Sequence, residues 1–329
     1  MASPLKLGVL DQSPIPEGQP AGAALRNSVD LARLADQLGY HRYWVAEHHG
    51  TPGLACTSPE ILIGQIAAAT ARIRVGSGGV MLPHYSPLKV AENFAILTGL
   101  FPGRIDLGVG RAAGTDAATT LALQRDRRRA MPDDFPEQFG ELLGYFEGGP
   151  GAKRIPGGRP NSCEVWLLGS SPQSAIWAAE LGLPYAVADF INPDGAPLAA
   201  LYRERFTPGV RLAGPRVAVA GWAVCADTAD EARALTASWR MLLALLHRGQ
   251  LIAVPSVAKA QAFLAEYGPD GGGLPLRRRT ITGTPPQVRA GIEALADEYR
   301  ADEVLLVNIL YDHAARRRSY ELIAREFGL

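Results

Sequence analysis

Residues 303–327 read EVLLVNILYDHAARRRSYELIAREF, and this stretch decides the fold. The continuous apolar run Val304–Val307 comes first, and residues 314–327 then follow with helical spacing. A strand covered by helices on both faces is apolar at every position, whereas a strand with one wet face alternates. The stretch therefore predicts a buried parallel strand followed by its helix.

The same unit of a short apolar run and a longer helical stretch recurs along the chain. The eight predicted strands are Leu5–Gln12, Tyr40–Glu47, Ile73–Leu82, Arg104–Gly110, Glu164–Gly169, Tyr185–Asp189, Arg216–Cys225 and Glu303–Ile309. Eight strands alternating with helices in 329 residues predict an α/β protein, a (β/α)8 TIM barrel forming one domain over residues 1–329. A doubly wound open sheet is the alternative.

Two polar segments are additional to the strands and helices of a minimal barrel. They are inserted loops after strands 4 and 7, at residues 112–131 and 248–280. Long loops in compact domains are usually lids or binding loops. We therefore expect these two segments to be lids or insertions near the site.

The composition excludes several classes of protein. Lys and Arg number 33, as do Asp and Glu, so the formal net charge is zero and nothing attracts nucleic acid or an anionic membrane in bulk. Cys56, Cys163 and Cys225 are far apart, which argues against a disulfide framework or a zinc cluster. No stretch of about 18 apolar residues occurs. We expect a cytoplasmic protein with a small-molecule substrate.

The candidate site residues follow from the predicted fold. In a (β/α)8 barrel the active site lies at the C-terminal ends of the strands. The residues there that could bind or react are Asp11, Gln12, Ser13, Glu47, His48, His49, Gly78, Gly79, His84, Arg111, Ser170, Ser171, Asp189, Asn192, Trp222, Asn308, Tyr311 and Asp312.

The sharpest local feature is Glu47-His48-His49, which directly follows the second strand. Either histidine could act as a general base, because imidazole titrates near neutral pH. A metal site is an alternative, but neighbouring residues of a strand point to opposite sides, so we expect no metal. Two histidines that only satisfy loop hydrogen bonds are the structural alternative.

Gly169-Ser170-Ser171 with Ser174 places hydroxyls and backbone N–H groups at a predicted helix start. Such a start binds phosphate, although a serine there can also be a plain helix cap. Arg111 ends the preceding strand and could add a guanidinium to the same phosphate, or form a surface ion pair. Residues 108–114 depart from the dinucleotide fingerprint, because the third glycine is displaced.

Three glycines, Gly76, Gly78 and Gly79, interrupt the third strand. Clustered glycines in a strand suggest an unusual backbone, the close approach of a flat ligand, or packing against a helix. A flat ligand with one phosphate, a histidine base and no dinucleotide fingerprint together suggest a mononucleotide cofactor such as FMN.

These residues resemble the bacterial luciferase-like flavin-dependent monooxygenases, and in particular the single-chain members similar to the luciferase α subunit. The resemblance spans nearly the whole chain, with its segments in the family's order. They are Ala46–Gly50, Gly76–Pro83, Gly103–Arg111, Gly169–Ser174, Gly283–Pro285 and Tyr311–Leu322.

The resemblance implies that FMN binds at the barrel mouth. His48 would be the catalytic histidine, and Gly78–Gly79 would be joined by a non-prolyl cis peptide. The cofactor-binding residues would be Gly78, Gly79, Arg111, Gly169, Ser170, Ser171 and Ser174. Glu47, His49 and His84 would border the substrate. A second phosphate-binding arginine would correspond to Arg129 or to one of Arg125, Arg127 and Arg128. Gly110 replaces the reactive cysteine of luciferase, which puts light emission in doubt.

The resemblance further implies a two-component monooxygenase, of a kind that in some members serves secondary metabolism. A separate flavin reductase would supply FMNH2, and O2 would convert it to a C4a-hydroperoxyflavin. The product would arise by hydroxylation, epoxidation or aldehyde oxidation. We expect a homodimer that pairs through early helices such as Pro59–Ala71. An F420-dependent hydride-transfer enzyme and a non-catalytic flavin-binding barrel are the alternatives.

Overall fold

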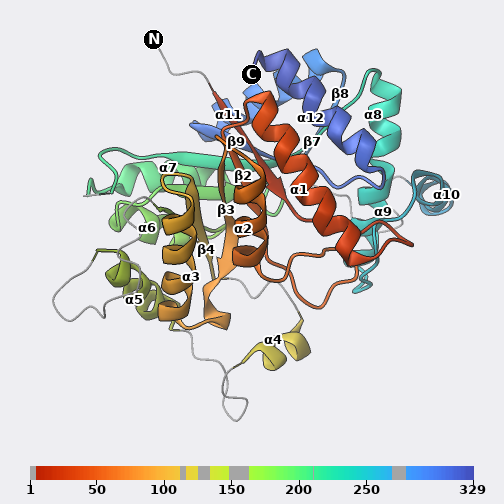
Figure 1. Ribbon diagram of the computed structural model, residues 1–329. Helices are drawn as coiled ribbons and strands as arrows, with labels where there is room; N and C mark the ends of the chain where they lie inside the picture. Colours follow the sequence, from red (N-terminus) through yellow and green to blue (C-terminus); the bar gives the residue numbers. More distant parts are fainter. Residues whose placement is uncertain (1–4, 112–115, 125–133, 148–162, 210, 269–278) are drawn as a thin grey trace.

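The computed structural model describes residues 5–111, 116–124, 134–147, 163–209, 211–268 and 279–329. In this part of the chain a parallel β-barrel forms the centre and helices cover its outside (Figure 1). The strands are β1 (Lys6–Asp11), β2 (Arg42–Val45), β3 (Arg74–Met81), β4 (Ile105–Gly110), β5 (Glu164–Leu168), β6 (Tyr185–Ala188), β7 (Val217–Cys225), β8 (Thr280–Gly283) and β9 (Glu303–Val307).

Eight of these strands close the barrel. β1 to β7 pair in sequence order, and β9 pairs with both β7 and β1 to complete the ring. All pairings are parallel, and each of the eight corresponds to a predicted strand. The prediction of a (β/α)8 barrel is confirmed.

The ninth strand, β8, was not predicted. It pairs with Trp222–Cys225 of β7, beyond the stretch Ala218–Trp222 that pairs with β9. Only Ile281 and Gly283 of its four residues are buried, so it lacks the apolar run that marks a barrel strand. The inserted segment after strand 7 therefore returns to the barrel as a short extra strand.

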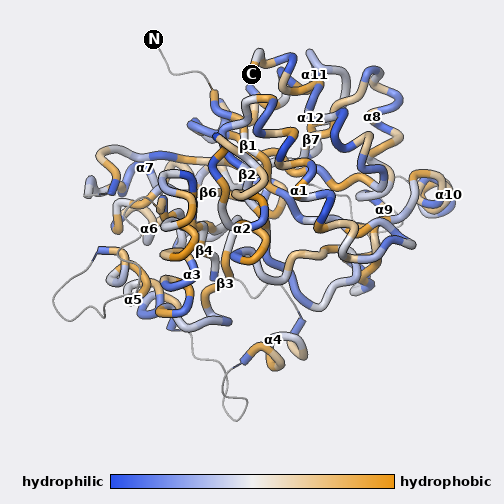
Figure 2. Tube along the Cα trace, viewed as in Figure 1, coloured by the Kyte–Doolittle hydropathy of each residue, from blue (hydrophilic) through white to orange (hydrophobic). Residues whose placement is uncertain are grey.

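The described helices are α1 (Ala21–Leu38), α2 (Pro59–Ala69), the 3-10 turn η1 (Leu82–His84), α3 (Pro87–Leu100), α4 (Ala117–Leu123), α5 (Phe135–Glu147), α6 (Pro172–Glu180), α7 (Ala196–Arg205), α8 (Ala229–Leu235), α9 (Ala237–Leu246), α10 (Val257–Tyr267), α11 (Pro285–Tyr299) and α12 (His313–Phe327). Figure 2 shows polar and apolar residues alternating along the outer helices, as expected for helices that bury one face. Helices α8 and α9 are separated at Thr236, whose hydroxyl donates to the carbonyl of Arg233 at 2.7 Å.

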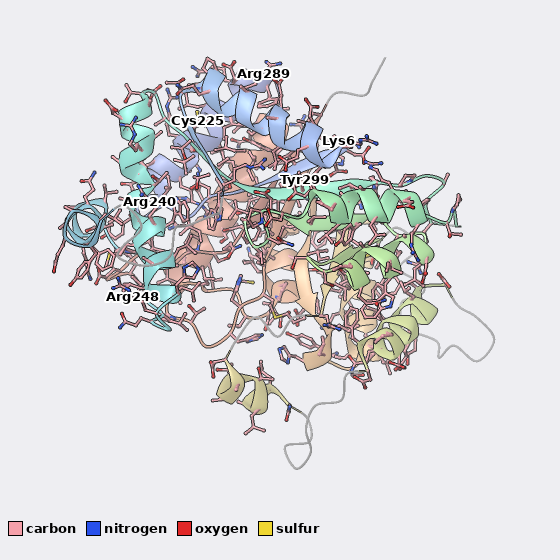
Figure 3. All side chains as sticks on the ribbon, turned by 180° about the vertical axis from the view of Figure 1, so that it is seen from behind. Lys6, Cys225, Arg240, Arg248, Arg289 and Tyr299 are labelled. Atoms are coloured by element: carbon pink, nitrogen blue, oxygen red, sulfur yellow. The ribbon has the colours of Figure 1, made fainter. Side chains whose placement is uncertain are left out.

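The two inserted segments contain structure of their own. The first holds α4, which stands apart from the barrel in Figure 1. The second holds α10. The guanidinium of Arg248, which precedes this helix, lies 5.8 Å from the ring centroid of Phe263 within it. Figure 3 marks this region from behind by Arg240 and Arg248. Val254 is tied to the loop after β1, because its N–H donates to the carbonyl of Ile15 at 2.8 Å. Residues 112–115, 125–131 and 269–278 of the predicted lids lie outside the described residues.

The N-terminal end of the barrel is filled by a cluster of buried ions. Arg42 is fully buried, and its guanidinium lies 2.6 Å from Asp106, 2.5 Å from Glu303 and 3.3 Å from Glu164. Arg74 adds a second cation to Asp106, and Arg216 adds one to Glu164. Burial alone would lower the pKa of Arg42, but Asp106 and Glu303 raise it above its ordinary value. The three arginines balance the three carboxylates.

We expect Arg42→Leu to destabilise the protein by about 3–5 kcal/mol, because it leaves buried carboxylates without their central cation. Urea unfolding of wild type and variant measures this difference. Arg233→Ala is the control, since its ion pair with Asp230 is exposed and should contribute less than about 1 kcal/mol. Equal effects of the two substitutions would show that the cluster does not stabilise the barrel.

Candidate active site

A cavity of about 340 Å³ opens at the C-terminal ends of the strands. It brings together the seven residues for which the sequence predicted cofactor binding, which are Gly78, Gly79, Arg111, Gly169, Ser170, Ser171 and Ser174. Its apolar walls come from residues that the sequence did not single out, among them Leu10, Trp44, Phe135, Leu168, Trp177, Phe190 and Leu305. An apolar cavity with a few polar groups at one end suits a ligand with an apolar ring and a polar tail.

One wall of the cavity is backbone. The peptide bond between Gly78 and Gly79 is cis, and the register of β3 against β4 shifts between Ser77 and Val80. A Cβ atom on Gly78 would lie 2.5 Å from Leu10, and one on Gly79 would lie 2.8 Å from the carbonyl oxygen of Gly108. Gly79 therefore has no room for a side chain, and both glycines contribute main-chain atoms to the lining of the cavity.

The polar end of the cavity is the start of α6. Ser171 caps this helix in a capping box with Ser174. The Ser174 hydroxyl donates to the carbonyl of Ser171 at 2.7 Å and contacts the Tyr185 hydroxyl at 3.1 Å. Tyr185 in turn donates to the carbonyl of Gly169 at 2.9 Å. The Ser174 hydroxyl is thus engaged within the protein and shapes this corner of the cavity.

The groups at this end that could contact an anion differ slightly from those predicted. Ser170 and Ser171 are exposed at the cavity, and Arg111 at the end of β4 lines the same space. Pro172 has no N–H, and the N–H of Gln173 has no hydrogen-bond partner among the described residues. Gln173 was missed because its contribution is a backbone group. Arg125, Arg127, Arg128 and Arg129 lie outside the described residues.

The histidine loop follows β2, and the residues that line this cavity do not include Glu47, His48, His49 or His84. Alternation along β2 places Arg42, Trp44 and Ala46 inside the barrel, and continuing it puts His48 on the inner side. The N–H of His48 donates to the carbonyl of Cys56 at 2.9 Å. Glu47 and His49 share the other side, where the Nε2 atom of His49 lies 2.7 Å from the carboxylate of Glu47. The rings of His49 and His84 meet edge to face, with centroids 5.9 Å apart.

His48 carries a largely buried imidazole whose charge state is set by its surroundings. Its Nδ1 atom is buried and has no hydrogen-bond partner among the residues that the structure describes. Burial lowers the pKa of His48 from 6.5 to about 4, and the neighbouring His49 contributes to the decrease. The ring is therefore uncharged at neutral pH.

Several other residues at the strand ends have structural roles. Asp11 is buried and accepts hydrogen bonds from Arg316 at 2.6 Å and from Tyr43 at 2.5 Å. Burial alone would raise the pKa of Asp11, but Arg316 and the hydrogen bonds hold it below its ordinary value. Asp312 caps α12, and the amide of Asn308 donates to the carbonyl of Ala223. The sequence could not reveal that Arg316 is the partner of Asp11, because 305 residues separate them.

The described residues contain no group of three or more His, Cys, Asp and Glu side chains placed to hold a metal ion. Within the same ranges, no helix combines the length and the apolar character needed to span a bilayer.

Several known proteins are similar to this chain over nearly its whole length. A family model described as luciferase-like monooxygenase matches residues 5–302. The luciferase-like monooxygenase of Escherichia coli (strain K12) is 40% identical over 97% of this chain and 96% of its own length. The N-acetyl-S-alkylcysteine monooxygenase of Bacillus subtilis (strain 168) is 35% identical over 97% of each chain.

Among solved structures, apo-MsnO8 is 40% identical, covers 99% of both chains and superposes with a TM-score of 0.90. Two more distant structures share the fold. They are the oxygenating constituent of 3,6-diketocamphane monooxygenase from Pseudomonas putida in complex with FMN (20% identity, 98% of both chains, TM-score 0.75) and an F420-dependent tetrahydromethanopterin reductase from Methanopyrus kandleri (18%, 98% of both chains, 0.68).

The low pKa of His48 makes a prediction about stability. The unfolded chain binds a proton at His48 below its ordinary pKa of 6.5, whereas the folded chain does so only near a pKa of about 4. The contribution of His48 to the free energy of unfolding is therefore fully present above the unfolded pKa of 6.5. It is lost as the pH falls toward the folded pKa of about 4. Between about pH 7 and pH 5 the wild type should lose about 2 kcal/mol more than His48→Gln, measured by urea unfolding. Parallel losses would show that His48 is not held neutral by burial.

Proposed function

The chain belongs to the luciferase-like monooxygenase family, and on this premise we propose that it is a two-component FMN-dependent monooxygenase. It would accept FMNH2 from a separate flavin reductase and use O2 to oxygenate a small organic substrate. One observation carries the proposal: a single cavity at the barrel mouth combines Arg111 and serine hydroxyls at one end with a wall formed by Gly78 and Gly79. Of the common flavins, FMN has this shape, with one terminal phosphate and one ring system.

The phosphate would bind where α6 begins. Arg111 would supply charge, Ser170 and Ser171 their hydroxyls, and Gln173 its backbone N–H. Gly78 and Gly79 would form the wall on which the ring system lies. In this placement the Oγ atom of Ser171 would still accept the N–H of Ser174, so phosphate binding is compatible with the capping box.

His48 would be the catalytic residue, because its uncharged imidazole can accept or return a proton at Nδ1. Reduced FMN supplies the electrons that activate O2. The apolar walls from Trp44, Trp177 and Phe190 would keep water away from the reacting atoms. The rings of His49 and His84 meet edge to face, and these two residues would border the substrate.

We expect the protein to bind FMN in preference to FAD and F420, because the anion site receives a terminal phosphate. Calorimetric titration of each cofactor, oxidised and reduced under anaerobic conditions, measures this preference, and FMNH2 should bind more tightly than FMN. Tighter binding of F420 would favour hydride transfer on the same fold. Equal binding of FAD would contradict the proposed anion site.

Arg111→Ala is the variant that ties this preference to the site. Loss of one charge-assisted contact should weaken FMN binding by about 1.5–3 kcal/mol, or about 10- to 150-fold. The melting temperature without FMN should barely change, because Arg111 is exposed. Arg233→Ala, on the remote helix α8, is the matched control and should bind FMN as the wild type does. A collapse of apoprotein stability in Arg111→Ala would assign the arginine a structural role.

His48→Ala should lower oxygenation by about 10²- to 10⁴-fold while leaving the fold and FMNH2 binding nearly intact. Coupled assays with a flavin reductase would follow product against released hydrogen peroxide, and peroxide should dominate in the variant. His49→Ala should affect the chemistry less, because its ring faces Glu47 instead of the barrel interior. An unchanged product yield per folded His48→Ala protein would remove His48 from the mechanism.

We also propose a homodimer that pairs through α2 and α3. Ile61, Ile96 and Leu100 on these helices are 74%, 58% and 66% exposed, which is unusual for large apolar residues on adjacent helices. Light scattering at micromolar protein should give twice the mass of 35.1 kDa. Ile61→Glu should shift the mass toward the monomer. A monomeric wild type would refute the pairing.

A further inference from the structure

Glu47 is a buried carboxylate that the chemistry proposed above does not use. It directly follows β2, and only 1% of its surface is exposed. Burying a carboxylate is unfavourable unless hydrogen bonds or cations compensate it. The groups that compensate the buried carboxylate therefore indicate the role of Glu47.

Both oxygens of Glu47 are engaged by groups from three different segments. Oε2 accepts the backbone N–H of Met81 at 3.0 Å, at the end of β3. Oε1 accepts the hydroxyl of Tyr85 at 2.9 Å, just after η1, and faces Nε2 of His49 at 2.7 Å. One side chain thus joins the end of β2, the end of β3 and the segment that leads into α3.

The chemistry of a carboxylate fixes the direction of all three contacts. An ionised carboxylate only accepts, so each partner must donate. Burial and the charge of Glu47 raise the pKa of Tyr85 above its ordinary value, so its hydroxyl keeps the proton that it donates. Because the carboxylate can only accept, His49 must carry a proton on Nε2 to form its contact with Glu47.

Two of the three segments border the proposed site. Met81, whose N–H is held, lines the cavity together with Gly78 and Gly79 on the same strand. His48 stands between Glu47 and His49, the two residues that the contact holds together. A shift of this carboxylate would move the backbone wall and the histidine loop at the same time.

We propose that Glu47 is a positioning residue that holds the end of β3 and the histidine loop in place before the flavin binds. The expected effect on FMN binding rests on the proposed function. The contacts of Glu47 do not depend on it. This positioning role also differs from the substrate contact that the sequence suggested, because both oxygens are used within the protein. Glu47 acts through Met81 and His49 and does not itself touch the cofactor.

Glu47→Gln tests this proposal and is compatible with folding. The amide oxygen can still accept the N–H of Met81, while the amide NH2 must donate toward Tyr85 and His49. Tyr85 can accept through its hydroxyl, but His49 can accept only if Nε2 loses its proton. In the apoprotein, ¹⁵N NMR of the imidazoles should show a proton on Nε2 of His49 in the wild type and none at neutral pH in Glu47→Gln.

The same variant should weaken FMN binding about 10-fold and change the visible circular dichroism of bound FMN, because the wall of the cavity is displaced. Tyr85→Phe is the matched control. It removes one donor, leaves the proton on Nε2 of His49, and should change FMN affinity less than about 3-fold. A merely structural role would lower stability in both variants without altering the dichroism of bound FMN.

A wild-type His49 without a proton on Nε2 would overturn the proposal, whatever the variants do. So would Glu47→Gln protein whose FMN affinity and His49 spectrum both match the wild type. A wild type that binds no FMN would instead refute the proposed function, and the NMR result on the apoprotein would still decide the role of Glu47.

Discussion

The structure depends on a guanidinium buried at the closed end of the barrel. Arg42 faces Asp106, Glu303 and Glu164 from three other strands, so one side chain holds β2, β4, β5 and β9 in a single register. The surrounding chain makes room for it. A Cβ atom on Gly8 would lie 2.8 Å from the Arg42 side chain. Such a cluster is costly to desolvate, and charge balance with Arg74 and Arg216 offsets that cost.

This cluster also determines where the site can be. Trp44 and Trp166 lie directly above it, edge to face at 5.3 Å, and the Trp44 indole donates to Asp106 at 2.9 Å. Trp44 in turn lines the cavity at the other end of the barrel. The ionic layer and the aromatic layer therefore form the floor, and only the C-terminal mouth remains open to a ligand. The loops at that mouth are free to carry Arg111, the histidine loop and the start of α6.

Local signals were enough to predict much of this arrangement. Continuous apolar runs such as Val304–Val307 revealed the eight barrel strands, because parallel strands are buried on both faces. Gly78 and Gly79 stood out because a strand seldom tolerates glycine, and Ser171 stood out as a helix cap. Residues 112–131 and 248–280 were recognised as additions to the barrel, though not the helices they contain.

Several of the features that were missed depend on partners distant in the sequence. The sequence around Arg42 is that of an ordinary strand and gives no sign of its ion-pair partners Asp106 and Glu303. Asp11 was a site candidate because its ion-pair partner, Arg316, lies 305 residues away in the sequence. β8 has a single buried aliphatic side chain, so its pairing with β7 is set by the barrel and not by its own pattern.

The central claim is that one cavity at the barrel mouth binds FMN by its phosphate and its ring at once. A crystal structure of the protein with FMN tests this most directly. The account predicts the phosphate at the start of α6, within hydrogen-bond distance of Arg111 and the backbone N–H of Gln173, and the ring system against Gly78–Gly79. FMN bound elsewhere, or with its phosphate away from α6, would contradict the account.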